Sequence, residues 1–332
     1  MTKIDLSTIA DELPIIFYTL PPSSVIYPNI IINAHKPDVG LRYIRKYHRY
    51  IKRVIIDSGI EIFRDPNVKD YPNGYRGQAY RLMRLYDKVE DLCYNAEIYV
   101  TCPDYCDDYH PKSLWLSEDY TNIERTVESI LWCTKNIPRL NWLIPIQAWY
   151  NNPSSVSRCI KLLAENGFEF EKYDYYAAAS ICQSKSINLI INLIINLIIN
   201  LRMYKQKFRL HIFGVHLKSI PELLRIAKYH YISVDKVGTH STDPNDLYRK
   251  YLLKHYLSYD SISYTRPVTT LVQKIIKSNK RFSCKSEVQR IIYFICYIAR
   301  LCELCNRYDL RDEVLKLLGI NNAINQKITD YF

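Results

Sequence analysis

Short runs of aliphatic and β-branched residues recur along the first 240 residues or so, and longer amphipathic stretches separate them. Each run has the length and composition of a buried strand, bounded by turn-forming residues. Seven such strands are predicted, and one weaker candidate follows them. The seven span residues 29–35, 53–59, 97–104, 141–147, 174–180, 209–216 and 231–235, and the weaker one spans 261–268.

Amphipathic stretches with helical spacing lie between these runs, at residues 77–95, 120–135, 153–166 and 220–228. Strands that alternate with helices predict a parallel sheet with crossover helices. A (β/α)8 TIM-type barrel fits this rhythm better than a dinucleotide-binding sheet, because no Gly-x-Gly-x-x-Gly follows any of the strands. We therefore predict a barrel over residues 1–268. A basic helical C-terminal extension, residues 269–332, is expected to pack on it.

The longest apolar run is INLIINLIINLIINL at residues 187–201. Its 15 residues fall short of the roughly 20 that a membrane-spanning helix needs, and an asparagine recurs at every fourth position. Such a repeat predicts a connecting helix with its asparagines along one face. We expect this helix to carry no chemistry of its own and not to enter a membrane.

The charge of the chain is unevenly distributed. Residues 1–201 hold 22 Lys and Arg against 23 Asp and Glu, whereas residues 202–332 hold 23 against 11. A basic half favours a polyanionic partner, since neutralising phosphates supplies most sequence-independent affinity for nucleic acid. The alternative is a basic but merely solvated helical surface. The residues expected to contact phosphate are Lys274, Lys277, Lys280, Arg281 and Lys285.

Ten cysteines occur without the regular spacing of a disulfide framework, and the chain begins without the pattern of a secretory signal. Both features predict a cytoplasmic protein with reduced, mostly buried thiols. Cys302 and Cys305 could supply two zinc ligands, yet no second Cys/His pair has finger-like spacing. We therefore expect neither a metal nor a cofactor.

Polar side chains stand where several predicted strands end. Asp57, Asp104 and Asp235 each close a strand, and Gln147 closes another. In a barrel, the carboxyl ends of the strands meet at one mouth, which is where catalytic groups gather. An aspartate after a strand often only caps the next helix. Three aspartates with an amide favour an active site over caps alone.

Six short motifs in this order carry a family resemblance. They are VIIDSG, CPDY, PIQAW, AASICQ, RLHIFGVH and SVD, spread over residues 29–240. The set resembles the tRNA-guanine transglycosylase superfamily, most closely its DNA-acting branch, the DeoxyPurine in DNA protein A family. The resemblance implies a (β/α) barrel that exchanges guanine in nucleic acid for a 7-deazaguanine base of the preQ0 type, without a cofactor. It leaves a homodimer open.

The resemblance also implies residue roles. Asp235 would be the nucleophile that attacks C1′ of the target nucleoside, and Asp57 the general acid and base. Asp104 would accept from the N1–H and N2–H side of guanine, and Gln147 would donate to O6. Phe213 would stack on the base, or else pack in the core. The remaining positions expected to line the substrate site are Ser58, Gly59, Ser180 and Gly214.

Departures from the family pattern bear on three alternative functions: base exchange in DNA, base exchange in tRNA, and nucleic-acid binding without catalysis. The cysteine cluster that binds zinc in the tRNA enzymes does not follow Asp235, and no separate RNA-binding domain is identifiable, which favours DNA over tRNA as the substrate. Ile60 and Glu61 replace the small and aromatic residues that often follow Asp-Ser-Gly, and Ala179 stands where the family has glycine. These substitutions leave a catalytically inactive nucleic-acid-binding barrel as the third alternative.

Overall fold

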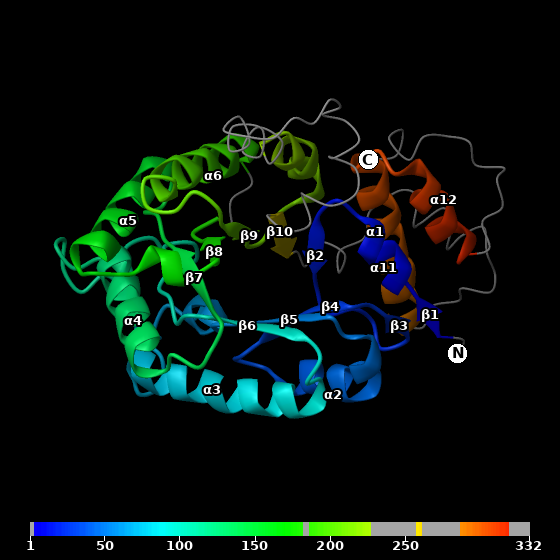
Figure 1. Ribbon diagram of the computed structural model, residues 1–332, viewed down its shortest axis with the longest axis horizontal. Coiled ribbons are helices and arrows are strands. Elements are labelled where there is room, and N and C mark those ends of the chain that lie inside the picture. Colours follow the sequence, from blue (N-terminus) through cyan, green and yellow to red (C-terminus); the bar gives the residue numbers. More distant parts are fainter. Residues whose placement is uncertain (1–2, 182–185, 227–256, 261–285, 319–332) are drawn as a thin grey trace.

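The computed structural model describes residues 3–181, 186–226, 257–260 and 286–318. Eight parallel strands form one sheet in the order β2-β10-β9-β8-β7-β6-β5-β4 (Figure 1). A separate parallel pair joins β1 (Ile4–Asp5) to β3 (Val25–Ile26). The eight strands are β2 (Ile16–Tyr18), β4 (Asn29–Asn33), β5 (Arg53–Asp57), β6 (Glu97–Thr101), β7 (Trp142–Ile146), β8 (Tyr175–Ala178), β9 (Arg209–Ile212) and β10 (Leu257–Asp260).

The two edge strands of this sheet, β2 and β4, meet and close it. Thr19, just after β2, forms a parallel bridge with Ile30 in β4. The Thr19 N–H donates to the Asn29 carbonyl at 3.2 Å, and the Ile31 N–H donates back to the Thr19 carbonyl at 3.2 Å. Closure removes the unpaired edges of an open sheet. The predicted (β/α)8 TIM-type barrel is confirmed.

Helices surround the strands, with α2 and α3 below the barrel in Figure 1, α4 and α5 to its left, α6 above and α11 to its right. Residues 220–226 are also helical, and short 3-10 turns connect several elements. The helices are α1 (Ser7–Glu12), α2 (Asp38–Tyr47), α3 (Gly74–Leu92), α4 (Asn122–Asn136), α5 (Val156–Glu165), α6 (Ile187–Leu201), α11 (Ser286–Leu304) and α12 (Tyr308–Lys316).

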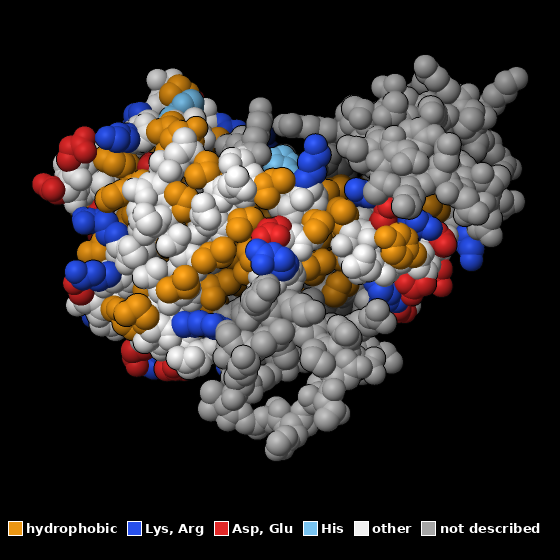
Figure 2. Space-filling view, turned by 90° about the horizontal axis from the view of Figure 1, so that it is seen from above, with side chains coloured by type: hydrophobic (Ala, Val, Ile, Leu, Met, Phe, Trp, Pro, Cys, Tyr) orange, Lys and Arg blue, Asp and Glu red, His pale blue; other side chains and the backbone are white. Residues whose placement is uncertain are grey.

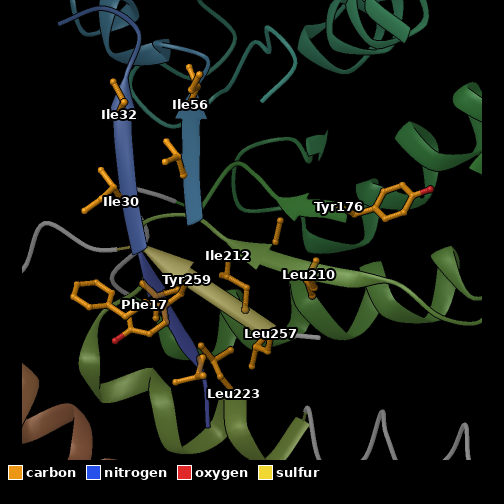
Figure 3. Close-up of a cluster of buried hydrophobic side chains, with 14 of the residues drawn as sticks. Phe17, Ile30, Ile32, Ile56, Tyr176, Leu210, Ile212, Leu223, Leu257 and Tyr259 are labelled. Carbon is orange, nitrogen blue, oxygen red and sulfur yellow. The ribbon is translucent and has the colours of Figure 1, made fainter. Parts of the chain in front are cut away.

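Alternation along the strands divides the core into two layers. Outward-facing side chains pack beneath the helices, and Figure 3 shows Ile30 and Ile32 of β4 near Ile56 of β5 in this layer. Inward-facing side chains form a smaller cluster inside the barrel. This cluster includes Tyr18, Ile55 and Tyr175, all of which are buried. The period of two in each strand therefore decides which residues can reach the barrel mouth.

Helix α11 covers the outer face of β2 and β10. Tyr297 stacks on Phe17 of β2 with ring centroids 5.0 Å apart, and its hydroxyl donates to the Tyr259 hydroxyl of β10 at 3.4 Å. Phe294 meets the ring of Tyr27 edge-on at 5.7 Å. The C-terminal helices thus share the core of the barrel. The predicted boundary between residues 268 and 269 lies outside the described residues, as do the five basic residues expected to contact phosphate.

Residues 187–201 form helix α6, as predicted. A repeat of four residues advances about 40° around a helix of 3.6 residues per turn, so the asparagine stripe winds slowly. Asn188 and Asn192 are exposed, whereas Asn196 and Asn200 are half-buried. Seen from the side on which α6 lies, the described surface carries many hydrophobic and uncharged side chains, with charged ones mostly at its edges (Figure 2). No helix among the described residues is long and apolar enough to cross a membrane.

Substitutions at two nearby positions of α6 can test how this helix packs. Leu197 is fully buried, whereas Ile199 is 59% exposed. We expect Leu197→Ala to lower the free energy of unfolding by about 2–5 kcal/mol, because it leaves a cavity in the core. The matched Ile199→Ala change should stay within about 0.5 kcal/mol of wild type. Urea unfolding of both variants measures the difference, and equal losses would contradict the orientation of α6.

The hydrophobic pattern predicts neither β2 nor β10, although it predicts the other six barrel strands to within a few residues at each end. β2 has three residues and β10 has four, which is too short to show a period of two. The strands expected at residues 231–235 and 261–268 lie outside the described residues. β10 ends one residue before the second of these ranges.

Candidate active site

Three carboxyl groups gather at the carboxyl ends of the barrel strands. Asp57 ends β5, and Ile55, two residues earlier, belongs to the cluster inside the barrel, so Asp57 also faces inward. Asp260 ends β10 in register with the inward-facing Tyr18 of β2. Asp104 follows β6 and is buried. The negative charges of Asp104 and Asp260 both act on Asp57, which places the three groups around one mouth.

Asp57 holds its proton unusually tightly. Burial raises the pKa of Asp57 to about 8, and the negative charges of Asp104, Asp260 and Glu61 contribute to this increase. The backbone N–H of Gly59 opposes it by hydrogen bonding to the carboxylate. At neutral pH the Asp57 carboxyl group is therefore mostly protonated, which is the state required of a general acid.

Asp104 is the centre of a buried hydrogen-bond network. The Ser58 hydroxyl donates to Oδ1 at 2.6 Å, and Nε2 of Gln147 donates to Oδ2 at 2.6 Å. Oε1 of Gln147 in turn accepts from the Ser180 hydroxyl. Burial raises the pKa of Asp104 to about 7, although the Ser58 and Gln147 hydrogen bonds oppose the increase. The structure thus brings four of the predicted site residues together. Ser58, Asp104, Gln147 and Ser180 are joined in this order by hydrogen bonds between their side chains.

The turn after β5 depends on glycine. Gly59 has a φ of 87°, which is in the left-handed region that side chains disfavour. A Cβ atom there would also lie 3.1 Å from the backbone nitrogen of His35. Nε2 of Gln78 donates to the Ser58 carbonyl at 2.6 Å. Backbone geometry therefore holds the Asp57-Ser58-Gly59 segment at the mouth.

Asp260 is a carboxyl group at the mouth that the sequence pattern did not predict. Its Oδ1 accepts a hydrogen bond from the Gly214 N–H at 2.9 Å and lies 3.4 Å from Nε2 of His211. A strand of four residues, LSYD, was the only available signal, and it is too short to separate from a loop. Asp235, the predicted nucleophile, lies outside the described residues and stays a prediction.

Phe213, predicted to stack on the base, lies between the mouth and the barrel interior. It belongs to the inner cluster and is 8% exposed. Its ring meets the imidazole of His211 edge-on, with centroids 4.6 Å apart. The following residue, Gly214, has a φ of 69°, which turns its N–H toward Asp260. Phe213 thus has a packing role, and its stacking role stays a prediction.

Asp107 forms hydrogen bonds to residues of the loops near the mouth. Its carboxylate accepts from Nε1 of Trp115 at 3.0 Å, from Nδ2 of Asn122 at 2.7 Å and from the Tyr150 N–H at 3.2 Å. Arg125 fixes the same region by donating to the Leu114 carbonyl at 2.6 Å. The hydrogen bond between Tyr150 and Asp107 joins the loop after β7 to the loop after β6.

A cleft of about 420 Å³ opens beside Ser180. The side chains of Trp149 and Leu193 form part of its wall, and Asp108 and Asn152 supply polar groups. Because Ser180 also bonds to Gln147, the cleft adjoins the Asp104 network. Of the network residues, Ser180 lines the cleft, whereas Asp104 and Gln147 are buried behind it.

The described cysteines are free and buried, as predicted for those eight positions. Cys182 and Cys284 lie outside the described residues. Burial raises the pKa of Cys302 to about 12 and also raises that of Cys305, which disfavours the thiolate forms that bind zinc. Among the described residues no group of three or more His, Cys, Asp or Glu side chains is placed to hold a metal ion.

The raised pKa values of Asp57 and Asp104 predict how stability depends on pH. Both groups bind a proton more tightly in the folded protein than in the unfolded chain, where carboxyl pKa values lie near 4. Their contribution is fully present below about pH 4 and is lost as the pH rises through about 7 to 8. Each group should lower the free energy of unfolding by up to about 1.4 kcal/mol per pH unit within this window.

Urea unfolding at pH 5 and pH 8 measures this loss, and Asp57→Asn and Asp104→Asn should each reduce it. Asp309→Asn is the matched control, because Arg307 lowers the pKa of Asp309 to about 2. The contribution of Asp309 is lost only on acidification below about pH 4, so this variant should keep the wild-type dependence between pH 5 and 8. A wild-type stability that rises from pH 5 to 8 would contradict the protonated state of the two aspartates.

No model of a known protein family matches the sequence, and no curated protein matches it either. The barrel is a fold common to enzymes, and enzymes of this fold carry their active sites at the carboxyl ends of the strands. The fold alone does not specify a reaction, since unrelated reactions use the same barrel. The chemistry of this protein has to be inferred from the carboxyl groups at its mouth.

Proposed function

We propose that this protein is a DNA-guanine transglycosylase that exchanges guanine for a 7-deazaguanine base at the barrel mouth. The observation that carries the proposal is the pairing of two aspartates in different environments. Burial raises the pKa of Asp57 to about 8, whereas Oδ1 of Asp260 accepts a hydrogen bond from the Gly214 N–H. Two carboxyl groups that differ in this way can divide acid and nucleophile roles, as they do in retaining glycosidases.

The first half of the reaction uses both groups. An oxygen of the Asp260 carboxylate attacks C1′ of the target nucleotide, and the C1′–N9 bond breaks with its electron pair going to the purine. Asp57 gives its proton to the departing purine, which leaves as neutral guanine. The deoxyribose is then held as an ester of Asp260, and Asp57 is a carboxylate. Because Oδ1 of Asp260 accepts from Gly214, Oδ2 is the oxygen available for attack.

The second half reverses these steps with the new base. The Asp57 carboxylate removes a proton from the incoming 7-deazaguanine, whose nitrogen attacks C1′. The ester C–O bond breaks and returns the electron pair to Asp260, so both aspartates regain their starting states. The glycosidic bond is conserved overall, and the exchange needs no nucleoside triphosphate.

The Asp104 network suits recognition of a guanine edge. A carboxylate can accept from N1–H and N2–H of guanine, and Gln147 retains a second N–H on Nε2 beyond the one donated to Asp104. Ser58 and Ser180 hold these two groups in fixed orientations. The target base must leave the duplex to reach them, at a cost of a few kcal/mol that backbone contacts have to offset.

Exchange of labelled guanine tests the proposal directly. The protein is incubated in parallel with duplex DNA and with tRNA, each in the presence of labelled guanine or a 7-deazaguanine, and incorporation is measured after digestion to nucleosides. Incorporation into DNA alone is expected. Incorporation into tRNA alone would identify the RNA enzyme instead. Binding of either nucleic acid without any exchange would favour an inactive binding barrel.

A further inference from the structure

A line of polar groups runs through the interior of the barrel. His211 lies on β9 in register with Ser258 on β10 and Ala177 on β8. Nδ1 of His211 is 2.8 Å from the Ser258 hydroxyl oxygen, and that oxygen also bonds to the Tyr175 hydroxyl. On its other side, Nε2 of His211 lies 3.4 Å from Oδ1 of Asp260. The line therefore runs from the middle of the barrel to the mouth.

The imidazole is fully buried and held on several sides. Its ring meets Tyr18 edge-on at 5.6 Å and Phe213 edge-on at 4.6 Å. Nε2 has no hydrogen-bond partner within normal distance among the described residues. A buried polar atom without a partner is costly, unless a small movement or a change of state completes the bond. Asp260 is the acceptor toward which this nitrogen is directed.

One direction of hydrogen bonding along the line corresponds to one tautomer of His211. Tyr175 can donate to the oxygen of Ser258, and Ser258 can then donate to Nδ1 of His211. Nδ1 as an acceptor requires the proton of the neutral ring to sit on Nε2, facing Asp260. Every group in the line then donates toward the mouth.

We propose that His211 is a positioning residue that holds Asp260 for attack. Its Nε2–H and the Gly214 N–H converge on Oδ1 of Asp260 and so direct Oδ2 to the substrate side. A shortening of the 3.4 Å distance by a few tenths of an ångström completes the bond when the substrate enters. This role rests on the proposed function, because it assigns Asp260 the nucleophilic step.

Two substitutions at His211 distinguish the roles of its two ring nitrogens. The amide of Gln reaches the position of Nε2 and can still donate to Asp260, whereas the amide of Asn reaches only the position of Nδ1 beside Ser258. We expect His211→Asn to lower kcat for base exchange roughly 10–100-fold, the scale of one hydrogen bond to a charged group, with KM little changed. His211→Gln should retain activity within a few-fold of wild type.

These outcomes distinguish the proposal from a structural role. If His211 only filled space, the two variants would lose activity in parallel with their thermal stability, and that result would overturn the proposal. If the wild-type protein exchanges guanine but the Asn and Gln variants are equally active, the positioning role fails while the transglycosylase function stands. If the wild type exchanges no base, both fail together.

A spectroscopic measurement tests the tautomer without any activity. The chain contains eight histidines, so His211→Gln assigns the His211 signals in long-range ¹H–¹⁵N spectra by their disappearance. The wild-type ring should carry a proton on Nε2 and none on Nδ1, and Ser258→Ala should weaken that preference. A proton on Nδ1 in the wild type would contradict the proposal, because Nε2 could not then donate to Asp260.

Discussion

Asp260→Asn is expected to abolish the covalent intermediate between protein and DNA. The amide keeps the size of the carboxylate but lacks the negative charge that attacks C1′. The variant should still bind DNA, because the substitution leaves the remaining surface unchanged. Denaturing electrophoresis of protein incubated with labelled DNA should show an adduct that resists denaturation for wild type and none for Asp260→Asn.

Asp235→Asn is the comparison that makes this result specific. The sequence motif predicts Asp235 as the nucleophile, whereas Asp260 stands on the barrel strand between β9 and β2. We expect Asp235→Asn to retain the adduct. Loss of the adduct in this variant, with Asp260→Asn unaffected, would assign the nucleophile to Asp235 and withdraw the role proposed for Asp260.

Asp57→Asn should slow base exchange by roughly 10²–10⁴-fold, the usual effect of removing a general acid or base. The nucleophile remains, so a slow adduct should still form and residual activity should exceed that of Asp260→Asn. Wild-type activity in the first half-reaction should fall as the pH rises through about 8, where Asp57 loses its proton. Single-turnover release of guanine across this range measures the dependence.

Glu61→Gln serves as the control that assigns this pH dependence to Asp57. The negative charge of Glu61 contributes to raising the pKa of Asp57, and its side chain pairs with Arg64 at 3.0 Å near the rim. Removing the charge should move the alkaline decline to lower pH without lowering the maximal rate. A decline that stays in place would mean that another group titrates.

Local sequence determined most of the barrel wall. Six of the eight strands have runs of aliphatic and β-branched residues long enough to be recognised, and α6 follows from its four-residue repeat. Asp57, Asp104 and Gln147 could be placed at a common mouth for the same reason, because in a barrel every strand end faces one side. These predictions need only the spacing of residues along the chain.

β2 and β10 could not be predicted in this way. They contain three and four residues, and the neighbours that make them strands are far away in sequence: Ser258 pairs with Ile16 on one side and with His211 on the other. Closure of the barrel selects such segments, since two strands are needed between β9 and β4 to pair their open edges. Asp260 was missed because its strand exists only in this context.

The sequence by itself thus determined the fold class and the kinds of group at the mouth, whereas the tertiary structure decided their states. Protonation of Asp57 depends on burial and on the charges of Asp104 and Asp260, which lie 47 and 203 positions away along the chain. The spacing of residues along a strand predicts only the direction in which a side chain points. Desolvation and the proximity of charges are properties of the closed barrel, and they decide which carboxyl group keeps its proton.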